Sequence, residues 1–180
     1  ITFPTYHLTD KLIVLSKWQQ SLIYLNHGIV GDIVPVGVDQ IFTNHGLRTN
    51  KKRIEISAIL RKPEGGFSWH REQDYLIKEL TFIKQTFGET QANFIIPPAE
   101  FASSPQLQKL RTTKDFNIYT PSNDQELSYL YNQTDIFVNS STFDTASLPG
   151  LEAMSCGAAL VTINAGGNQD YCVNEQNCLI

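Results

Sequence analysis

The 180-residue chain carries 14 Lys and Arg against 18 Asp and Glu, with 41% hydrophobic and 18% charged residues. This size and composition suit one soluble globular domain with a sizeable core. The net charge of −4 argues against general nucleic-acid affinity, and no apolar run approaches the roughly 20 residues that span a bilayer. Because the chain starts Ile-Thr-Phe, we interpret it as an excised or processed piece whose missing targeting signal says little about its parent.

The N-terminal quarter predicts two short strands around one helix. Residues 11–16 (KLIVLS) form a strand candidate, and Ser16 is placed to cap a helix over 17–25 that Asn26-His27-Gly28 ends. Residues 33–36 form a second extended run, followed by a turn at 37–39. The basic stretch 48–53 (RTNKKR) is expected to be a solvated loop.

The middle of the chain alternates strands with helices. Strands are expected at 54–60, 93–96 (running into Pro97-Pro98) and 116–119, and helices at 72–87, 107–111 and after Asp124, a plausible N-cap. This alternation predicts an α/β fold with a parallel, doubly wound sheet. We find no internal repeat, low-complexity segment or domain boundary, so residues 1–180 are expected to form a single domain.

Residues 135–170 read as a strand–loop–helix–strand unit. Strands are expected at 135–139 and 160–163, with a polar loop over 140–147. Pro149 suits a first helical turn, Gly157 suits a left-handed helix end, and a turn follows at 166–168. Ligands of parallel sheets bind at the carboxyl ends of strands, where a helix N-terminus suits a phosphate and carboxylates accept hydrogen bonds from sugar hydroxyls. The carboxylates of Asp144 and Glu152 are expected at this end.

This unit resembles the signature of retaining glycosyltransferases of family 4, whose GT-B fold pairs two Rossmann-like domains. The family pattern is an acid, seven residues, then Glu followed by Ala-Met-x-Cys-Gly and a later Gly-Gly. The chain has Asp144, then Glu152 followed by AMSCG, then Gly166-Gly167. The resemblance extends more weakly over nearly all 180 residues, although Val36 replaces the usual Asn of a Pro-Asn-Gly-Val-Asp turn. It implies one half of a GT-B fold.

The resemblance also assigns roles to the acids and the loop between them. It implies that Glu152 binds the nucleotide ribose and that Asp144, usually a Glu, contacts the transferred sugar. The loop of Thr145, Ala146, Ser147 and Leu148 is usually glycine-rich in the family. Its backbone N–H groups do not depend on glycine and can donate to phosphates, and Thr145 and Ser147 add hydroxyls. A loop residue that needs a positive φ would be strained without glycine.

Two arginines are expected to neutralise the leaving diphosphate. Arg61 follows the strand at 54–60, where the family places an Arg, and we choose Arg71 over Lys62 for the family's second cation. Gly166 and Gly167 are expected to flank the donor pocket. The simpler alternatives are a first-turn Glu for Glu152, a turn Asp for Asp144, solvated arginines and a plain glycine turn.

No metal or bound cofactor is expected beyond a nucleotide diphosphate sugar as donor substrate. The histidines show no i, i+4 pair, and the cysteines show no metal-ligand spacing; their odd count favours a cytosolic protein. The four histidines are His7, His27, His45 and His70, and the three cysteines are Cys156, Cys172 and Cys178.

We therefore expect the C-terminal, donor-binding domain of a retaining glycosyltransferase of polysaccharide or glycoconjugate synthesis. Residues 97–99 and 119–122 are expected to select the base. A missing N-terminal domain would bind a glycan or lipid-linked acceptor, so the fragment alone would be inactive. The parent is expected in the cytoplasm, with the inner membrane face as one location there. A sugar-nucleotide epimerase, a phosphorylase and a non-catalytic module that kept the fold remain alternatives.

Overall fold

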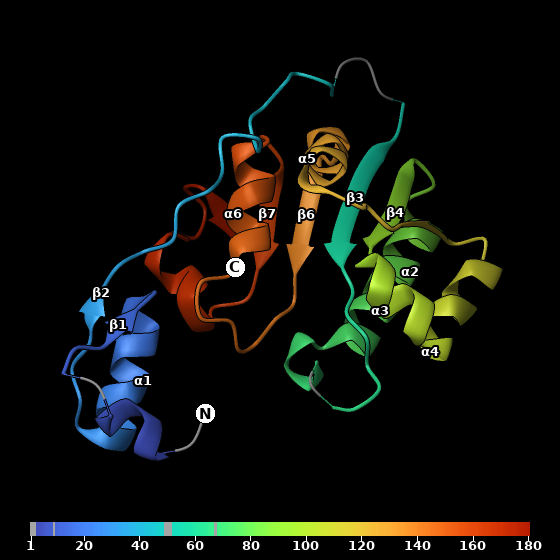
Figure 1. The fold of residues 1–180 in the computed structure, drawn as a ribbon. Helices are drawn as coiled ribbons and strands as arrows, with labels where there is room; N and C mark the ends of the chain where they lie inside the picture. The colour runs from blue at the N-terminus through green and yellow to red at the C-terminus, as the bar shows by residue number, and fades with distance from the viewer. Residues whose placement is uncertain (1–2, 9, 49–51, 67) are drawn as a thin grey trace.

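The computed structural model describes residues 3–8, 10–48, 52–66 and 68–180, which contain two parallel sheets (Figure 1). The larger sheet has six strands in the order β5-β4-β3-β6-β7-β8. The smaller one pairs β1 with β2. Among the described residues, no helix has the length and apolar character of a membrane span.

The N-terminal unit follows the predicted order of strand, helix and strand. After a 3-10 helix (η1, Phe3–His7) come β1 (Ile13–Val14), α1 (Lys17–His27) and β2 (Asp32–Ile33), both strands being shorter than predicted. The Ser16 hydroxyl accepts a hydrogen bond from the Gln19 N–H, and Gly28 ends the helix at a φ of 69°. The predicted caps of α1 are therefore confirmed.

The six-stranded sheet confirms the predicted parallel α/β fold. Its strands are β3 (Ile54–Ile59), β4 (Thr90–Ile95), β5 (Phe116–Tyr119), β6 (Ile136–Asn139), β7 (Ala159–Thr162) and β8 (Cys178–Leu179). The chain runs outward from β3 through β4 to β5, and then returns to place β6 on the other side of β3. Ligands bind at such a reversal of strand order, at the carboxyl ends of the two strands that flank it.

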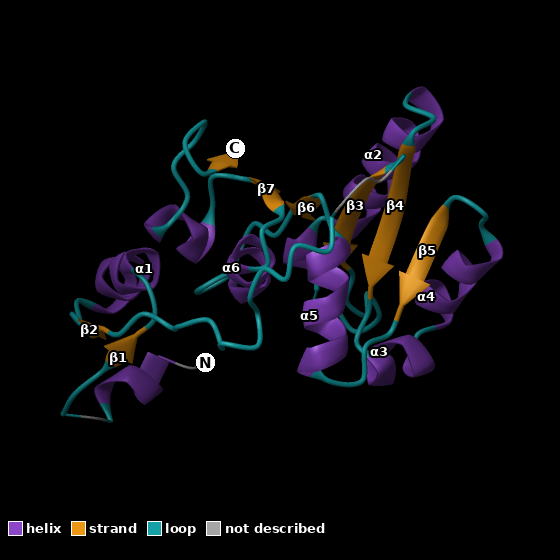
Figure 2. Cartoon of the chain, turned by 90° about the horizontal axis from the view of Figure 1, so that it is seen from above, coloured by secondary structure: helices purple, strands orange, loops and turns teal. Residues whose placement is uncertain are grey.

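Helices cover both faces of this sheet, because its strands contribute apolar side chains to two core clusters. The helices are α2 (Gln73–Thr86), α3 (Pro98–Ser103), α4 (Pro105–Lys109), α5 (Asp124–Gln133) and α6 (Leu148–Ser155), with 3-10 helices η2 (Trp69–Arg71), η3 (Leu110–Thr112) and η4 (Gly166–Asp170). Ile56, Ala58 and Leu60 belong to one core cluster with side chains of α2, α3 and α4. Phe137 belongs to the other cluster, with residues of α5 and α6. Figure 2 shows α4 and α5 on opposite sides of the sheet.

Several expected boundaries are wrong by a residue or more. The strand expected at 93–96 is Thr90–Ile95, and a helix that was not expected, α3, begins at Pro98, because proline is tolerated in a first helical turn. The N-cap of α5 is Asn123, whose side chain accepts from the Glu126 N–H, rather than Asp124. Sequence periodicity also missed the two-residue strand β8.

The connector into the large sheet is anchored on α5 and α6. The Asn132 side chain accepts from the His45 N–H at 2.7 Å and donates to the Thr43 carbonyl at 2.9 Å. The Arg48 guanidinium donates to carbonyls of Tyr131, Thr134 and Cys156 at the ends of these helices. The expectation of a solvated loop is therefore wrong for Arg48. Lys52 and Arg53 are exposed, and positions 49–51 lie outside the described residues.

Candidate functional site

Two loops meet where the strand order reverses, although they are far apart in the sequence. One follows β3 and ends in η2, and the other follows β6. The Thr142 N–H and hydroxyl donate to the His70 carbonyl at 2.7 and 2.9 Å, and the Ser140 hydroxyl donates to the Arg71 carbonyl at 2.5 Å. These bonds hold the loop after β3, which carries the predicted cations Arg61 and Arg71, against the loop after β6 (residues 140–147), which carries Asp144 and is called the acid loop below.

The structure brings Arg71 and Asp144 together across 73 positions of sequence. Arg71 Nη2 lies 3.3 Å from Asp144 Oδ1, and His70 Nε2 lies 3.9 Å from the same oxygen. These side chains are only 17–20% exposed, so solvent screens the pair weakly. Burial and the neighbouring Arg71 charge lower the pKa of His70, which favours its neutral imidazole.

Arg61 lies in the same region, in a pocket of about 290 Å³ that Arg71 also lines. Its Nε donates to Glu100 Oε1 at 2.8 Å, while Glu100 Oε2 accepts from the Lys62 N–H at 2.7 Å. The hydrogen bond to Glu100 raises the pKa of Arg61. Sequence reasoning missed Glu100 because it missed α3. An acid just after Pro-Pro at the end of a strand was the available signal.

The loop of residues 144–148 leads into α6 with unused backbone donors. No described group accepts a hydrogen bond from the N–H of Thr145, Ala146 or Ser147. Ser147 takes a φ of 52°, the left-handed conformation for which the sequence lacks glycine. Its buried hydroxyl accepts from Asn139 Nδ2 at 2.7 Å, whereas Thr145 is exposed. The Ser147 hydroxyl thus braces the loop, and Leu148 begins the helix.

Gly166 and Gly167 fit directly against the backbone of this loop. The Gly167 N–H donates to the Asp144 carbonyl at 2.7 Å. A Cβ at Gly166 would lie 2.5 Å from the Asp144 carbonyl oxygen, and one at Gly167 would lie 2.0 Å from that of Thr145. No side chain fits such spaces, so the two glycines set where the acid loop lies.

Glu152 lies on α6 and faces α5. Its Oε2 accepts from the Tyr131 hydroxyl at 3.2 Å. Burial raises the pKa of Glu152, with the Asp124 charge adding to the shift and the Tyr131 bond opposing it. Among the described residues, Tyr131 is the hydrogen-bond partner of its carboxylate, and no hydrogen bond or ion pair joins that carboxylate to residues 144–148. Asp144 and Glu152 therefore occupy different surroundings.

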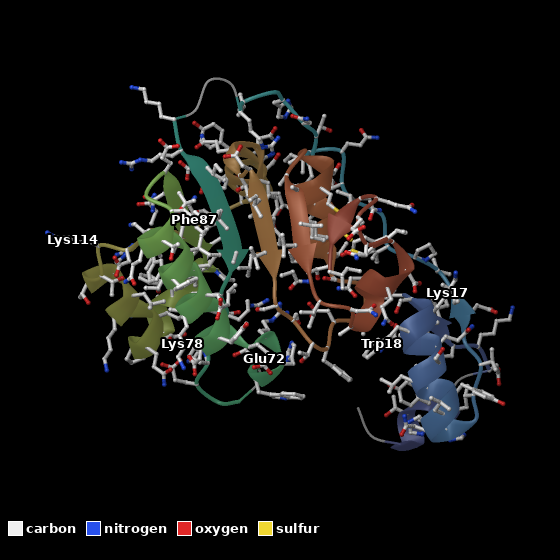
Figure 3. All side chains as sticks on the ribbon, turned by 180° about the vertical axis from the view of Figure 1, so that it is seen from behind. Lys17, Trp18, Glu72, Lys78, Phe87 and Lys114 are labelled. Atoms are coloured by element: carbon white, nitrogen blue, oxygen red, sulfur yellow. The ribbon has the colours of Figure 1, made fainter. Side chains whose placement is uncertain are left out.

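The N-terminal unit packs onto the acid loop, which the sequence did not indicate. The Trp18 and Phe143 rings meet edge to face, with centroids 4.9 Å apart. The Lys17 N–H at the start of α1 donates to Asp170 Oδ2 at 2.8 Å. Figure 3 shows Trp18 at the same end of the sheet as Glu72, which follows η2. The carboxyl end of the sheet is therefore bordered by α1.

The site holds cations, carboxylates and free backbone donors at the reversal point of a Rossmann-like sheet, the arrangement of a GT-B glycosyltransferase domain. No three His, Cys, Asp or Glu residues gather as a metal site in the described part of the chain. The sequence profile of the family described as "Glycosyl transferases group 1" matches residues 65–180. The chain belongs to this family.

Similar proteins agree with this assignment. The sulfoquinovosyl transferase SQD2 of Arabidopsis thaliana is 29% identical over 140 residues, which are 78% of this chain and 27% of the relative. The chain thus spans about a quarter of that protein.

Solved structures share the fold. The C-terminal domain of a glycosyl transferase group 1 family protein (LpcC) from Francisella tularensis has a TM-score of 0.60 at 21% identity, covering 79% of this chain and 78% of that one. Sucrose-phosphate synthase from Thermosynechococcus elongatus has a TM-score of 0.73 at 17% identity, covering 98% and 46%. Anabaena Alr3699/HepE, solved in complex with UDP and glucose, has a TM-score of 0.73 at 17% identity, covering 96% and 49%.

Proposed function

We propose that this chain is the donor-binding part of a retaining glycosyltransferase that uses a nucleotide diphosphate sugar. The observation that carries the proposal is the meeting of Arg71 and Asp144 beside the free N–H groups of residues 145–147. A sugar diphosphate needs cations and N–H donors for its phosphates and a carboxylate for its sugar hydroxyls. This constellation supplies all three at one point.

The two arginines are suited to a departing diphosphate. A guanidinium has five N–H donors, and Arg71 uses one contact on Asp144. Arg61 gives Nε and Nη2 to Glu100, which leaves Nη1 for a phosphate. Because both groups are held by carboxylates before a ligand arrives, they need little reorganisation when charge develops on the leaving group.

The two carboxylates bind different parts of the donor. Asp144, beside Arg71, orients the transferred sugar, and Glu152 accepts hydrogen bonds from the ribose. Gly166 and Gly167 keep the loop of residues 144–148 in place, so its N–H groups reach the phosphates. The resemblance of the Asp144–Glu152 pattern to the family 4 signature supports retention of the anomeric configuration.

The rest of the enzyme lies outside this chain in our proposal. The solved LpcC structure that it resembles is described as a C-terminal domain, which supports a donor-binding C-terminal half. A separate N-terminal domain would then bind a glycan or lipid-linked acceptor in the cytoplasm, at the inner membrane face where the acceptor is lipid-linked. The isolated fragment is expected to turn over nothing.

The test is a donor-cleavage assay with the full-length protein. UDP-, GDP-, ADP- and dTDP-glucose are each incubated with enzyme, released diphosphate is measured, and the freed sugar is followed by NMR before it mutarotates. We expect release from donors of one base, with the donor's anomeric configuration kept and a strong loss in Arg71→Ala. An inverted anomer would refute the retaining mechanism. Release that Arg71→Ala leaves unchanged would refute the site.

A further inference from the structure

Trp69 is an exposed tryptophan beside the cation pocket. Its side chain is 71% exposed, whereas Trp18 is half-buried against Phe143. Singly exposed apolar side chains are common on protein surfaces, so Trp69 is a candidate binding residue because of the hollow that it lines. The Trp69 ring meets the His70 ring edge to face, with centroids 5.8 Å apart, and among the described residues it makes no hydrogen bond to Arg61, Arg71 or Asp144.

The turn that carries Trp69 is firmly held. The His70 carbonyl accepts two hydrogen bonds from Thr142, and the Arg71 N–H donates to the Ser68 carbonyl at 3.0 Å. Ser68 is buried, and its hydroxyl donates to the Lys62 carbonyl at 2.6 Å. The indole is thus presented on a fixed backbone, so little conformational entropy is lost when a ligand stacks on it.

Trp69 forms one wall of a hollow of about 180 Å³ that adjoins the cation pocket at Ser68. Its lining residues come from the loop after β3 and the start of α2: Pro63, Gly66, Ser68, Trp69, Glu72, Gln73 and Asp74. The hollow is smaller than the roughly 300–1,000 Å³ of pockets for drug-sized ligands. It suits a ligand portion of one ring.

The chemistry of the hollow selects an uncharged sugar ring. A pyranose presents C–H groups on its face and hydroxyls at its edge, which match an aromatic face with carboxylates beside it. Glu72 and Asp74 are exposed, and their carboxylates have no hydrogen-bond or ion-pair partner among the described residues. No cation lines this hollow in the described chain. The two carboxylates repel phosphates and anionic lipid headgroups, so a neutral sugar fits better than a membrane surface.

We propose that the Trp69 hollow is a subsite for a neutral pyranose ring of the acceptor glycan. The assignment to the acceptor rests on the proposed function, because that function already places the donor sugar at Asp144, beside His70 and Arg71. A sugar held by Trp69 then lies next to the donor site without competing for it.

The experiment compares the full-length protein with three variants on an array of neutral oligosaccharides, followed by titration of the strongest binder. Trp69→Ala removes the ring, Trp69→Phe keeps a smaller one, and Phe87→Ala removes a 58% exposed ring at the other end of α2 (Figure 3). We expect about tenfold weaker binding for Trp69→Ala, partial retention for Trp69→Phe and no change for Phe87→Ala. UDP, GDP, ADP and dTDP affinities should stay at wild-type values in all three.

Each contrary result overturns the proposal in a recognisable way. If the array shows no oligosaccharide whose binding depends on Trp69, there is no acceptor subsite. If Trp69→Ala weakens only nucleotide-sugar binding, the ring belongs to the donor site. If it weakens only sedimentation with vesicles of phosphatidylcholine and phosphatidylglycerol, the ring contacts membrane. Failure of the proposed donor function would show separately, as absent nucleotide binding in the wild type.

Discussion

Arg48 should be the most destabilising surface arginine to remove, because it joins two helix ends. Its Nη2 donates to the carbonyls of Tyr131 and Cys156 at 2.8 and 2.7 Å, and its Nε donates to that of Thr134. Burial lowers its pKa, although a guanidinium stays charged at neutral pH. A cation here also opposes the partial negative charge at the ends of α5 and α6.

The cost of Arg48→Ala is estimated from these bonds. Each hydrogen bond to a charged group contributes about 1.5–3 kcal/mol, but water replaces part of this at a half-buried position. A total of about 2–4 kcal/mol lowers the Tm by about 4–16 °C in a protein of this size. Arg48→Lys keeps the charge without the planar fork and should fall in between.

The assay is thermal unfolding followed by circular dichroism, with Arg53→Ala as the matched control. Arg53 is exposed, and its removal should change stability by less than about 0.5 kcal/mol. Equal Tm values for Arg48→Ala and Arg53→Ala would refute the conclusion that Arg48 holds the helix ends together.

Two further predictions concern the donor site. Gly167→Ala should cost about 1–3 kcal/mol and weaken nucleotide binding, because its Cβ would lie 2.0 Å from the Thr145 carbonyl oxygen. Gly88→Ala is the control, because nothing lies within 4 Å of a Cβ at that position. Equal melting temperatures for the two variants would contradict the close packing of Gly167 against the Thr145 backbone. Glu152→Gln should raise the Tm relative to wild type more at pH 8 than at pH 4, while weakening nucleotide binding. Burial raises the pKa of the Glu152 carboxyl in the folded protein. The protonated carboxyl therefore contributes its full stability below the pKa of the unfolded chain, and this contribution is lost as pH rises through the pKa of the folded protein. A Tm difference that shrinks at pH 8 would contradict this.

Short sequence patterns predicted much of the fold, because helix caps and strand alternation depend on residues close together in the sequence. Ser16 and Gly28 were recognisable as the ends of α1, since a hydroxyl N-cap and a left-handed glycine act on their own helix. The alternation of strands and helices predicted the parallel sheet. Helix α3 was not predicted, because a Pro-Pro pair usually marks a break in regular structure, although proline is also accepted in a first helical turn.

The site was predicted as a set of residues but not as an arrangement. Arg71 and Asp144 were each expected near the donor, yet their pairing depends on which strands are neighbours at the reversal of the sheet. The partner of Arg61, Glu100, lies on the helix that was missed. Arg48 was expected in a solvated loop because nothing in a basic stretch indicates which helix ends it will reach.

The central claim is that Arg71, beside Asp144, binds the diphosphate of a nucleotide sugar. Isothermal titration of the full-length protein with UDP, GDP, ADP and dTDP tests it most directly, with Arg71→Ala and the exposed Arg53→Ala compared. We predict that one diphosphate binds the wild type and Arg53→Ala equally, and binds Arg71→Ala about 10–100-fold more weakly. Binding of no diphosphate to the wild type, or equal binding to Arg71→Ala, would contradict the claim.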